Sequence, residues 1–175
     1  MEPDSTIFEI RAARCSIDDK AGTLRALQET ARCFNTHITC FNADLLAGRR
    51  HAESAMRHAI RACIAGETIS NTLEMEALLY AAGSRQCNVA ASFGIHEGEN
   101  NLWICCYPSC DGVWDALSPV MQLQDGSSWD AMDRRKQERL MQVFGITKEE
   151  QDSLDGADRF ADLVLERVAL LEVIR

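Results

Sequence analysis

The sequence predicts an α+β fold: a single domain, residues 1–175, in which a small, mostly antiparallel sheet packs against several helices. Three observations support this prediction. The chain has 175 residues, of which 46% are hydrophobic and 26% charged, and this composition suits one domain with a substantial core. Short β-branched and aromatic runs predict strands. Longer segments repeat apolar residues at helical spacing.

The first part of the chain predicts two strands and two helices. A partly alternating run over residues 6–14 indicates the first strand, and Ser16 is a candidate N-cap for a helix from 17 to about 33. The β-branched run over 36–41 indicates the second strand. The clearest helix covers 47–65, where apolar residues recur at three- and four-residue steps and a glycine follows. Its core-facing stripe consists of Ala52, Ala55, Met56, Ala59, Ile60, Cys63 and Ile64.

Two more helices are expected directly afterwards. Residues 73–82 are apolar on nearly every side, which predicts a largely buried helix. Asn71 and Glu74 have the spacing of a capping box at its start. Ser84 is a candidate cap for a short helix that would begin at Arg85.

The second half of the chain predicts one strand and several helices. The strand is expected over 102–107, and the loop-rich region that follows, 108–128, contains a candidate short helix at 113–117. The remaining helices are expected over 129–144, from Thr147, and over 158–174. No segment repeats another, and none has low complexity.

The charge is acidic overall and unevenly distributed. A net charge of −9 argues against the basic bulk that is usual in nucleic-acid-binding proteins, so any anion site must be local. Residues 37–65 are the exception, with four arginines against two carboxylates. No stretch approaches the roughly eighteen apolar residues that a membrane span needs. The acidic start lacks the order of a secretory signal, so we expect a cytoplasmic protein with no membrane contact.

The helix over 47–65 carries a candidate anion-binding strip. Arg50, Arg57 and Arg61 fall within about 40° of one another on the helical wheel, opposite the apolar stripe, and Arg49 lies at the same helix end. Such a strip can attract phosphates in an otherwise acidic protein. The alternative is that these arginines are simply solvated on a surface helix.

Two expected helix starts, at 70–72 and at 84–86, are also candidate anion sites. A helix N-terminus presents free backbone N–H groups and a partial positive charge. At the second start, Arg85 offers a forked donor for phosphate and Gln86 can read a base edge. The alternative is two ordinary helix caps.

The sequence contains no enzyme signature. It lacks a phosphate-binding loop, a glycine-rich dinucleotide motif, a nucleophile elbow and a His-Glu-x-x-His zinc motif, so we expect no catalytic residue, no cofactor and no metal. Among eight cysteines, the only cluster is Cys105, Cys106 and Cys110. Adjacent cysteines in a strand point to opposite faces, which disfavours a shared metal and favours free, buried thiols.

The last expected helix is apolar around most of its circumference. Such a helix is either buried on two sides or leaves an apolar patch for a partner. Leu163, Leu170 and Ile174 are the candidate partner-binding residues. The alternative is that this helix covers the domain's own sheet.

Several segments resemble one known family. They are Gly-Arg-Arg-His at 48–51, His-Ala-Ile-Arg-Ala at 58–62, the run over 66–86, Phe-Gly-Ile at 93–95, Gly-Glu-Asn-Asn at 98–101 and the tail at 165–171. In these segments the chain resembles archaeal members of the KEOPS kinase-binding subunit family, whose eukaryotic relative is the PRPK-binding protein. The resemblance covers about three quarters of the chain, and its most specific part is 69–86.

The resemblance implies a small α/β domain without catalysis. It implies docking on the N-terminal lobe of the small atypical kinase/ATPase subunit of the complex, and recruitment of tRNA through its single-stranded 3′ CCA end. The complex makes threonylcarbamoyl-adenosine in tRNAs that read codons beginning with A. The residues that would hold tRNA are Arg49, Arg50, Arg57, Asn71, Thr72, Arg85 and Gln86.

Two alternatives to this reading stay open at the level of the sequence. One is a protein adaptor whose partners alone contact RNA. The other is a thiol- or metal-dependent enzyme centred on Cys105, Cys106 and Cys110.

Overall fold

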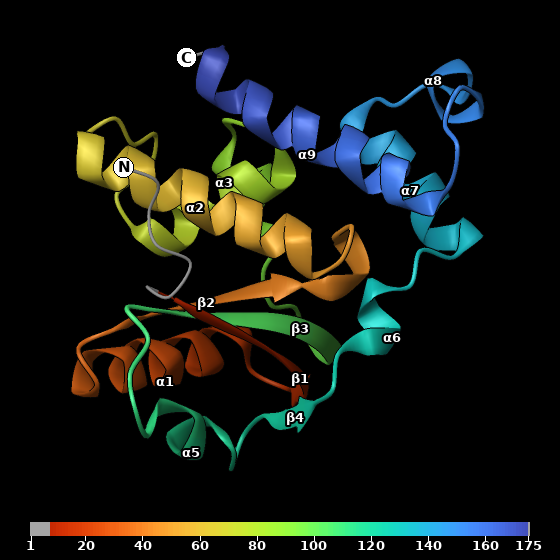
Figure 1. Ribbon diagram of the computed structural model, residues 1–175. Helices are drawn as coiled ribbons and strands as arrows, with labels where there is room; N and C mark the ends of the chain where they lie inside the picture. Colours follow the sequence, from red (N-terminus) through yellow and green to blue (C-terminus); the bar gives the residue numbers. More distant parts are fainter. Residues whose placement is uncertain (1–7, 175) are drawn as a thin grey trace.

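The computed structural model describes the backbone of residues 8–174 and all of their side chains except those of residues 157 and 158. Four antiparallel strands form one sheet in the order β2-β3-β1-β4. Helices cover both of its faces, with α1 and α5 on one and α2, α3 and α9 on the other (Figure 1). The α+β prediction with an antiparallel sheet is confirmed.

The helices and strands have the following bounds. The strands are β1 Glu9–Ile17, β2 His37–Asn42, β3 Gly98–Tyr107 and β4 Gln122–Gln124. The longer helices are α1 Lys20–Cys33, α2 Arg49–Ala65, α3 Leu73–Ala82, α7 Arg134–Phe144 and α9 Ala157–Val173. The short helices are η1 Ala43–Leu45, α4 Cys87–Ala91, α5 Val113–Leu117, α6 Ser127–Asp130 and α8 Lys148–Asp152.

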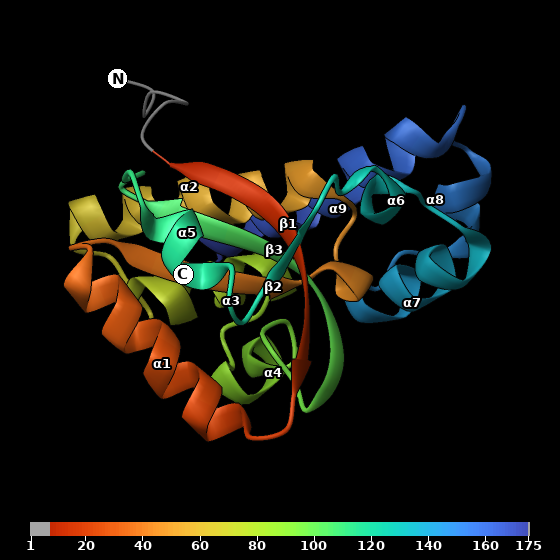
Figure 2. The same ribbon diagram turned by 90° about the horizontal axis from the view of Figure 1, so that it is seen from below.

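Alternation along the strands divides the core into two clusters. On β1, Ala12 belongs to the larger cluster, under α2, α3 and α9, whereas Ala13 belongs to the smaller one. On β2, Phe41 and Cys40 divide in the same way. Figure 2 views the sheet from the side that α1 and α5 cover. Helices therefore bury the middle of the sheet on both faces, whereas Arg11, Arg14 and Ser16 of β1 and most of β4 remain exposed.

The first strand and helix differ from the sequence prediction. β1 continues to Ile17, because Ser16 and Ile17 pair with β3 and the side chain of Ile17 is buried. Asp19, not Ser16, caps α1, and its carboxylate accepts the N–H of Gly22 at 3.1 Å. Sheet pairing, which the local sequence does not reveal, outweighs the local capping signal. Residues 6 and 7 of the expected strand lie outside the described residues.

The helix prediction for α2 is confirmed, including Gly66 as its left-handed C-cap. Cys63 and Ile64 were expected in the core, and this is wrong: both are exposed. Ala62 in the same turn is buried, so the last turn of α2 is covered on one side only. Two histidines, His51 and His58, are instead buried on this helix.

The expected single helix over 129–144 is two helices. α6 ends with Ala131 in an extended conformation, and α7 begins after Asp133, whose carboxylate accepts the N–H of Lys136 at 2.8 Å. The buried Trp129 packs edge-on against Trp103 at 5.9 Å, and this contact fixes α6 on the sheet. The strand β4 was not expected. The short helices at Val113–Leu117 and after Thr147 are confirmed, the second with a complete capping box.

His51 links the start of α2 to the end of α3 inside the core. Its Nδ1 accepts the N–H of Ala47 at 3.0 Å, so its proton lies on Nε2, which donates to the carbonyl of Ala81 at 2.8 Å. Burial lowers the pKa of His51 from 6.5 to about 4. Protonation therefore favours the unfolded chain between these two pH values, and stability is lost as the pH falls through this range.

We expect the protonation of His51 to lower the free energy of unfolding by about 2 kcal/mol when the pH falls from 7 to 5. Denaturant titrations at the two pH values measure the change. The variant His51→Gln can keep both hydrogen bonds but cannot titrate, so its stability should depend less on pH by this amount. An equal pH dependence in both proteins would contradict the assignment.

Candidate functional site

The N-terminus of α2 is occupied by a carboxylate from the same chain. Gly48 adopts φ +84°, and a Cβ there would lie 2.7 Å from Oδ1 of Asp130. The same oxygen accepts the backbone N–H of Arg49 at 2.7 Å. Only a glycine allows this close approach, and the carboxylate provides the negative charge that a helix N-terminus favours.

The arginines of α2 lie on its polar side but most of them contact carboxylates. Arg49 pairs with Glu53 on the same helix at 2.9 Å, and Arg50 pairs with Asp162 of α9 at 3.1 Å. Arg61 lies 3.7 Å from Glu172, also of α9. These pairs reduce the positive potential that the sequence predicts for this strip.

Arg57 has a different environment. Its guanidinium lies over the ring of Phe8, 5.8 Å from the ring centroid. Among the described residues no carboxylate forms an ion pair with Arg57. Among the arginines of α2, Arg57 is thus the one that no carboxylate among the described side chains neutralises in an ion pair.

The loop before α3 is held from inside the fold. The buried carboxylate of Glu76 accepts the N–H groups of Ile69 and Ser70 at 3.0 and 2.9 Å, and the hydroxyl of Ser70 at 2.9 Å. Thr72 caps α3, and its hydroxyl accepts the N–H of Met75 at 3.2 Å. The capping box predicted for Asn71 is wrong, because the cap lies one residue later.

Arg85 and Gln86 lie at the other end of α3. Gln86 is the N-cap of α4, which has five residues, and Arg85 donates to the carbonyl of Ile174 at 3.0 Å. The helix predicted to begin at Arg85 begins at Cys87. The hydroxyl of Ser84 accepts the N–H of Gln86 at 3.1 Å, and Gln86 precedes the helix, so Ser84 is not its N-cap. The ten residues of α3 separate the two expected helix starts by about 15 Å.

The residues predicted to hold tRNA therefore form three groups. Arg49, Arg50 and Arg57 lie along α2; Asn71 and Thr72 lie before α3; Arg85 and Gln86 lie after it. The structure does not combine them into one compact pocket.

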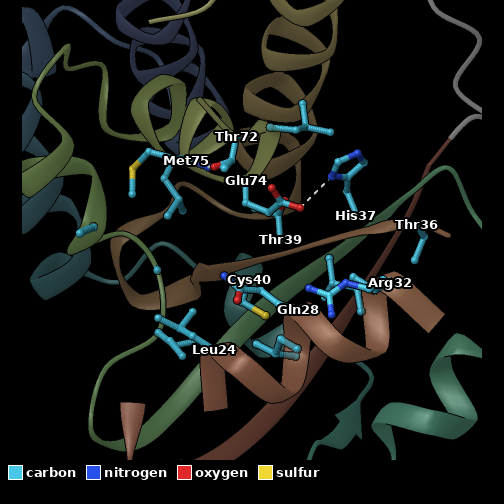
Figure 3. A pocket seen from close by; sticks show the side chains of 18 of the residues that line it. Leu24, Gln28, Arg32, Thr36, His37, Thr39, Cys40, Thr72, Glu74 and Met75 are labelled. Carbon is cyan, nitrogen blue, oxygen red and sulfur yellow. Dashed lines mark hydrogen bonds and ion pairs between the residues drawn. The ribbon is translucent and has the colours of Figure 1, made fainter. Parts of the chain in front are cut away.

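The structure contains a groove that the sequence did not indicate. It has a volume of about 520 Å³ and lies between α1 and α3, along β2 (Figure 3). Asn71 and Thr72 lie on its rim, where the imidazole of His37 contacts the carboxylate of Glu74 at 2.8 Å. Glu74 therefore pairs with a strand instead of completing a capping box. No sequence signal identifies this groove, because it depends on which strand lies at the edge of the sheet.

The last helix is anchored on one side and exposed at its end. Its buried face consists of Phe160, Val164, Val168 and Leu171. At its C-terminal end, Leu170, Val173 and Ile174 are 46%, 77% and 63% exposed. Leu163, predicted to contact a partner, is half-buried against the main core because α9 packs on α2, α3 and α7. The helix thus covers the chain's own core and also leaves an apolar end.

The cysteine cluster is divided by the sheet. Cys105 belongs to the larger core cluster, whereas Cys106 and Cys110 lie on the opposite face. Burial raises the pKa of Cys105 well above its ordinary value and that of Cys106 to about 12, so both thiols are protonated at neutral pH. In the described part of the chain, no three His, Cys, Asp or Glu side chains are placed to hold a metal ion together.

The fold and these surfaces define a class of protein: an α+β domain with a four-stranded antiparallel sheet, helices on both faces and an exposed apolar helix end. The family model described as kinase binding protein CGI-121 matches residues 16–172, and the chain belongs to this family. None of the curated proteins matches the sequence significantly. No helix among residues 8–174 combines the length and apolarity that crossing a bilayer requires.

Proposed function

We propose that this chain is the non-catalytic, kinase-binding subunit of a KEOPS-type complex that makes threonylcarbamoyl-adenosine in tRNA, and that it is of the archaeal type. It binds the atypical kinase/ATPase subunit through the exposed end of α9 and helps to recruit tRNA through the 3′ CCA end. The observation that carries the proposal is the apolar end of α9 in a member of a kinase-binding family.

Several contacts support a docking role for this end. Four buried side chains fix α9 on the domain, so the exposed ones are presented rigidly. Glu172 contacts His58 at 3.2 Å and Arg61 at 3.7 Å, which brings the end of α9 beside the end of α2, where Ile64 is exposed. An apolar centre with charged groups around it is the usual composition of a protein interface.

The tRNA part of the proposal rests on the arginines of α2. Arg49 and Arg57 are eight residues apart, or about 12 Å along the helix, which suits several successive phosphates of a single strand. The pair Arg50–Asp162 is exposed (62% and 55%), and the pair Arg49–Glu53 is partly exposed (50% and 25%). Pairs of this kind contribute about 0–1 kcal/mol, so a phosphate can replace the carboxylate at little cost.

We expect the double variant Arg50→Glu with Arg57→Glu to bind tRNA at least about tenfold more weakly. The slope of the logarithm of the binding constant against the logarithm of the salt concentration should become shallower by the equivalent of about two phosphate contacts. Gel shifts with a tRNA transcript at several salt concentrations measure both quantities. Arg134→Glu reverses an exposed arginine on α7 and serves as the control. Removing the 3′ CCA from the transcript should weaken binding to the wild type.

The ion pairs of α2 also favour a second candidate, a protein adaptor without RNA contact. Because Arg49, Arg50 and Arg61 already pair with carboxylates, this candidate predicts that the double variant behaves like Arg134→Glu. Kinase binding together with unchanged tRNA affinity would select the adaptor and reject the tRNA contact.

A further inference from the structure

The groove along β2 contains a free sheet edge. β2 is the first strand in the order β2-β3-β1-β4, so β3 pairs with one of its edges and the other edge faces the groove. Figure 3 looks into the groove, with β2 between α3 and α1. An edge strand presents backbone donors and acceptors that a further strand can pair with.

Backbone contacts at both ends of β2 show where this edge is free. The N–H of Thr36 donates to the carbonyl of Ala31 at 2.9 Å, and the N–H of Asn42 donates to that of Phe93 at 2.6 Å, both outside the sheet. In a strand, the backbone N–H and C=O of successive residues point to opposite edges. The N–H and C=O groups of Ile38 and Cys40, like those of Thr36 and Asn42, therefore point away from β3. Within the described residues, these groups have no hydrogen-bond partner across the groove.

The carbonyl of Cys40 lies close to Gly94, which also lines the groove. A Cβ built on Gly94, in the wall of the groove, would lie 3.8 Å from this oxygen. Ile38 and Cys40 are themselves buried, so their unpaired backbone groups are costly unless something pairs with them.

Apolar side chains line both sides of this edge. On the α1 side they include Leu24, Leu27 and Ala31, and on the α3 side they include Leu73, Met75 and Leu78. A strand added to β2 points successive side chains alternately to the two faces of the sheet. Its apolar residues would therefore contact both walls.

The charges on the rim indicate what flanks such a strand. Lys20 and Arg32 stand near opposite ends of α1, about 18 Å apart, and both line the groove. Arg32 pairs with Glu29 at 2.9 Å, but this pair is exposed and a carboxylate of the peptide can replace Glu29 at little cost. On the other rim, Glu74 is already paired with His37. An extended segment of about five residues spans this length and would bring a carboxylate to each cation.

We propose that this groove binds an extended peptide segment of a partner protein, which adds to β2 as a fifth strand and carries apolar residues with acidic residues at its ends. The walls formed by α1 and α3 stand on both sides of the edge, so the sheet of a second folded copy cannot reach it. The inference does not depend on the kinase interface at α9 or on the arginines of α2, but the groove shares Asn71 and Thr72 with the predicted tRNA site.

The test begins with a display library of random peptides of about ten residues, selected on the wild type and counter-selected on Gly94→Leu. Gly94 does not have a positive φ, and the nearest atom to an added Cβ is the flexible end of Leu78 at 3.3 Å, so this variant should fold with a blocked groove. We expect enriched peptides that alternate apolar residues between acidic ends.

Synthetic copies of an enriched peptide then test the pairing. Two peptides are N-methylated at every second residue, one at the odd and one at the even positions. Only one set of N–H groups faces β2, so one peptide should lose affinity about tenfold or more and the other should bind nearly unchanged. Leu24→Lys should lower affinity about tenfold, and Val143→Lys, at an equally exposed position on α7 (both 40%), should not.

Three results would overturn the proposal. The first is a library without enriched peptides. The second is equal binding of the two N-methylated patterns. The third is binding of a labelled single-stranded oligonucleotide ending in CCA to the wild type but not to Gly94→Leu. That result would make the groove a nucleic-acid site.

Discussion

Replacement of Glu76 by alanine is expected to lower the free energy of unfolding by about 3 kcal/mol. The carboxylate is buried on α3 and accepts three hydrogen bonds from Ile69 and Ser70. Its removal leaves two backbone donors and a hydroxyl without this acceptor in the interior, and also creates a small cavity. Denaturant titration at neutral pH measures the loss.

Glu74 provides the matched control for this prediction. It lies two residues earlier on the same helix, but its carboxylate is partly exposed and pairs with His37. Glu74→Ala should change the stability by no more than about 0.5–1 kcal/mol. If both variants lose the same stability, Glu76 does not hold the loop that carries Asn71 and Thr72.

The double variant Val173→Asp with Ile174→Asp is expected to weaken binding of the kinase subunit by about a hundredfold or more. Both side chains are exposed in the free chain, so a docked partner would have to bury two new carboxylates in an apolar contact. Calorimetric titration of the kinase subunit with each protein measures the difference.

The fold of this variant should be intact. Val173 ends α9 and Ile174 is its C-cap, and neither belongs to the buried face of the helix. Its unfolding free energy should therefore remain within about 0.5 kcal/mol of the wild type. Val143→Asp, an exposed valine on α7, is the control. If the control and the double variant bind the kinase subunit with equal affinity, the end of α9 is not part of the interface.

Periodicity predicted most of the secondary structure because it is a local property. The stripe of α2 and the start of a short helix at Thr147 follow from residues close together in the sequence. The boundary at Ser16 was wrong because it depends on pairing with β3, more than 80 positions later in the chain. The split between α6 and α7 depends on Trp129 meeting Trp103, which is likewise a tertiary contact.

The candidate site could be predicted only in part for the same reason. The sequence placed the arginines on one side of α2, but Asp162 and Glu172, which pair with Arg50 and Arg61, come from α9 more than a hundred residues away. The free edge of β2 depends on the strand order, which no local pattern contains. The sequence predicted an apolar surface on this helix but not which of its residues are exposed. Leu170 and Ile174 are exposed and Leu163 is half-buried, a difference that depends on how α9 packs on the domain.

Hydrogen–deuterium exchange of the chain, alone and with an equal amount of the kinase subunit, measures most directly whether the end of α9 is the docking surface. The end of α9 is packed on one side by Leu171 and exposed on the other at Leu170 and Val173, so a docked partner should slow the exchange of its amides further. We expect the kinase to slow exchange in the last two turns of α9 and in the last turn of α2, near Ile64, and to leave the amides along β2 unchanged. Unchanged exchange at the end of α9, with protection along β2 and the start of α3 instead, would contradict it.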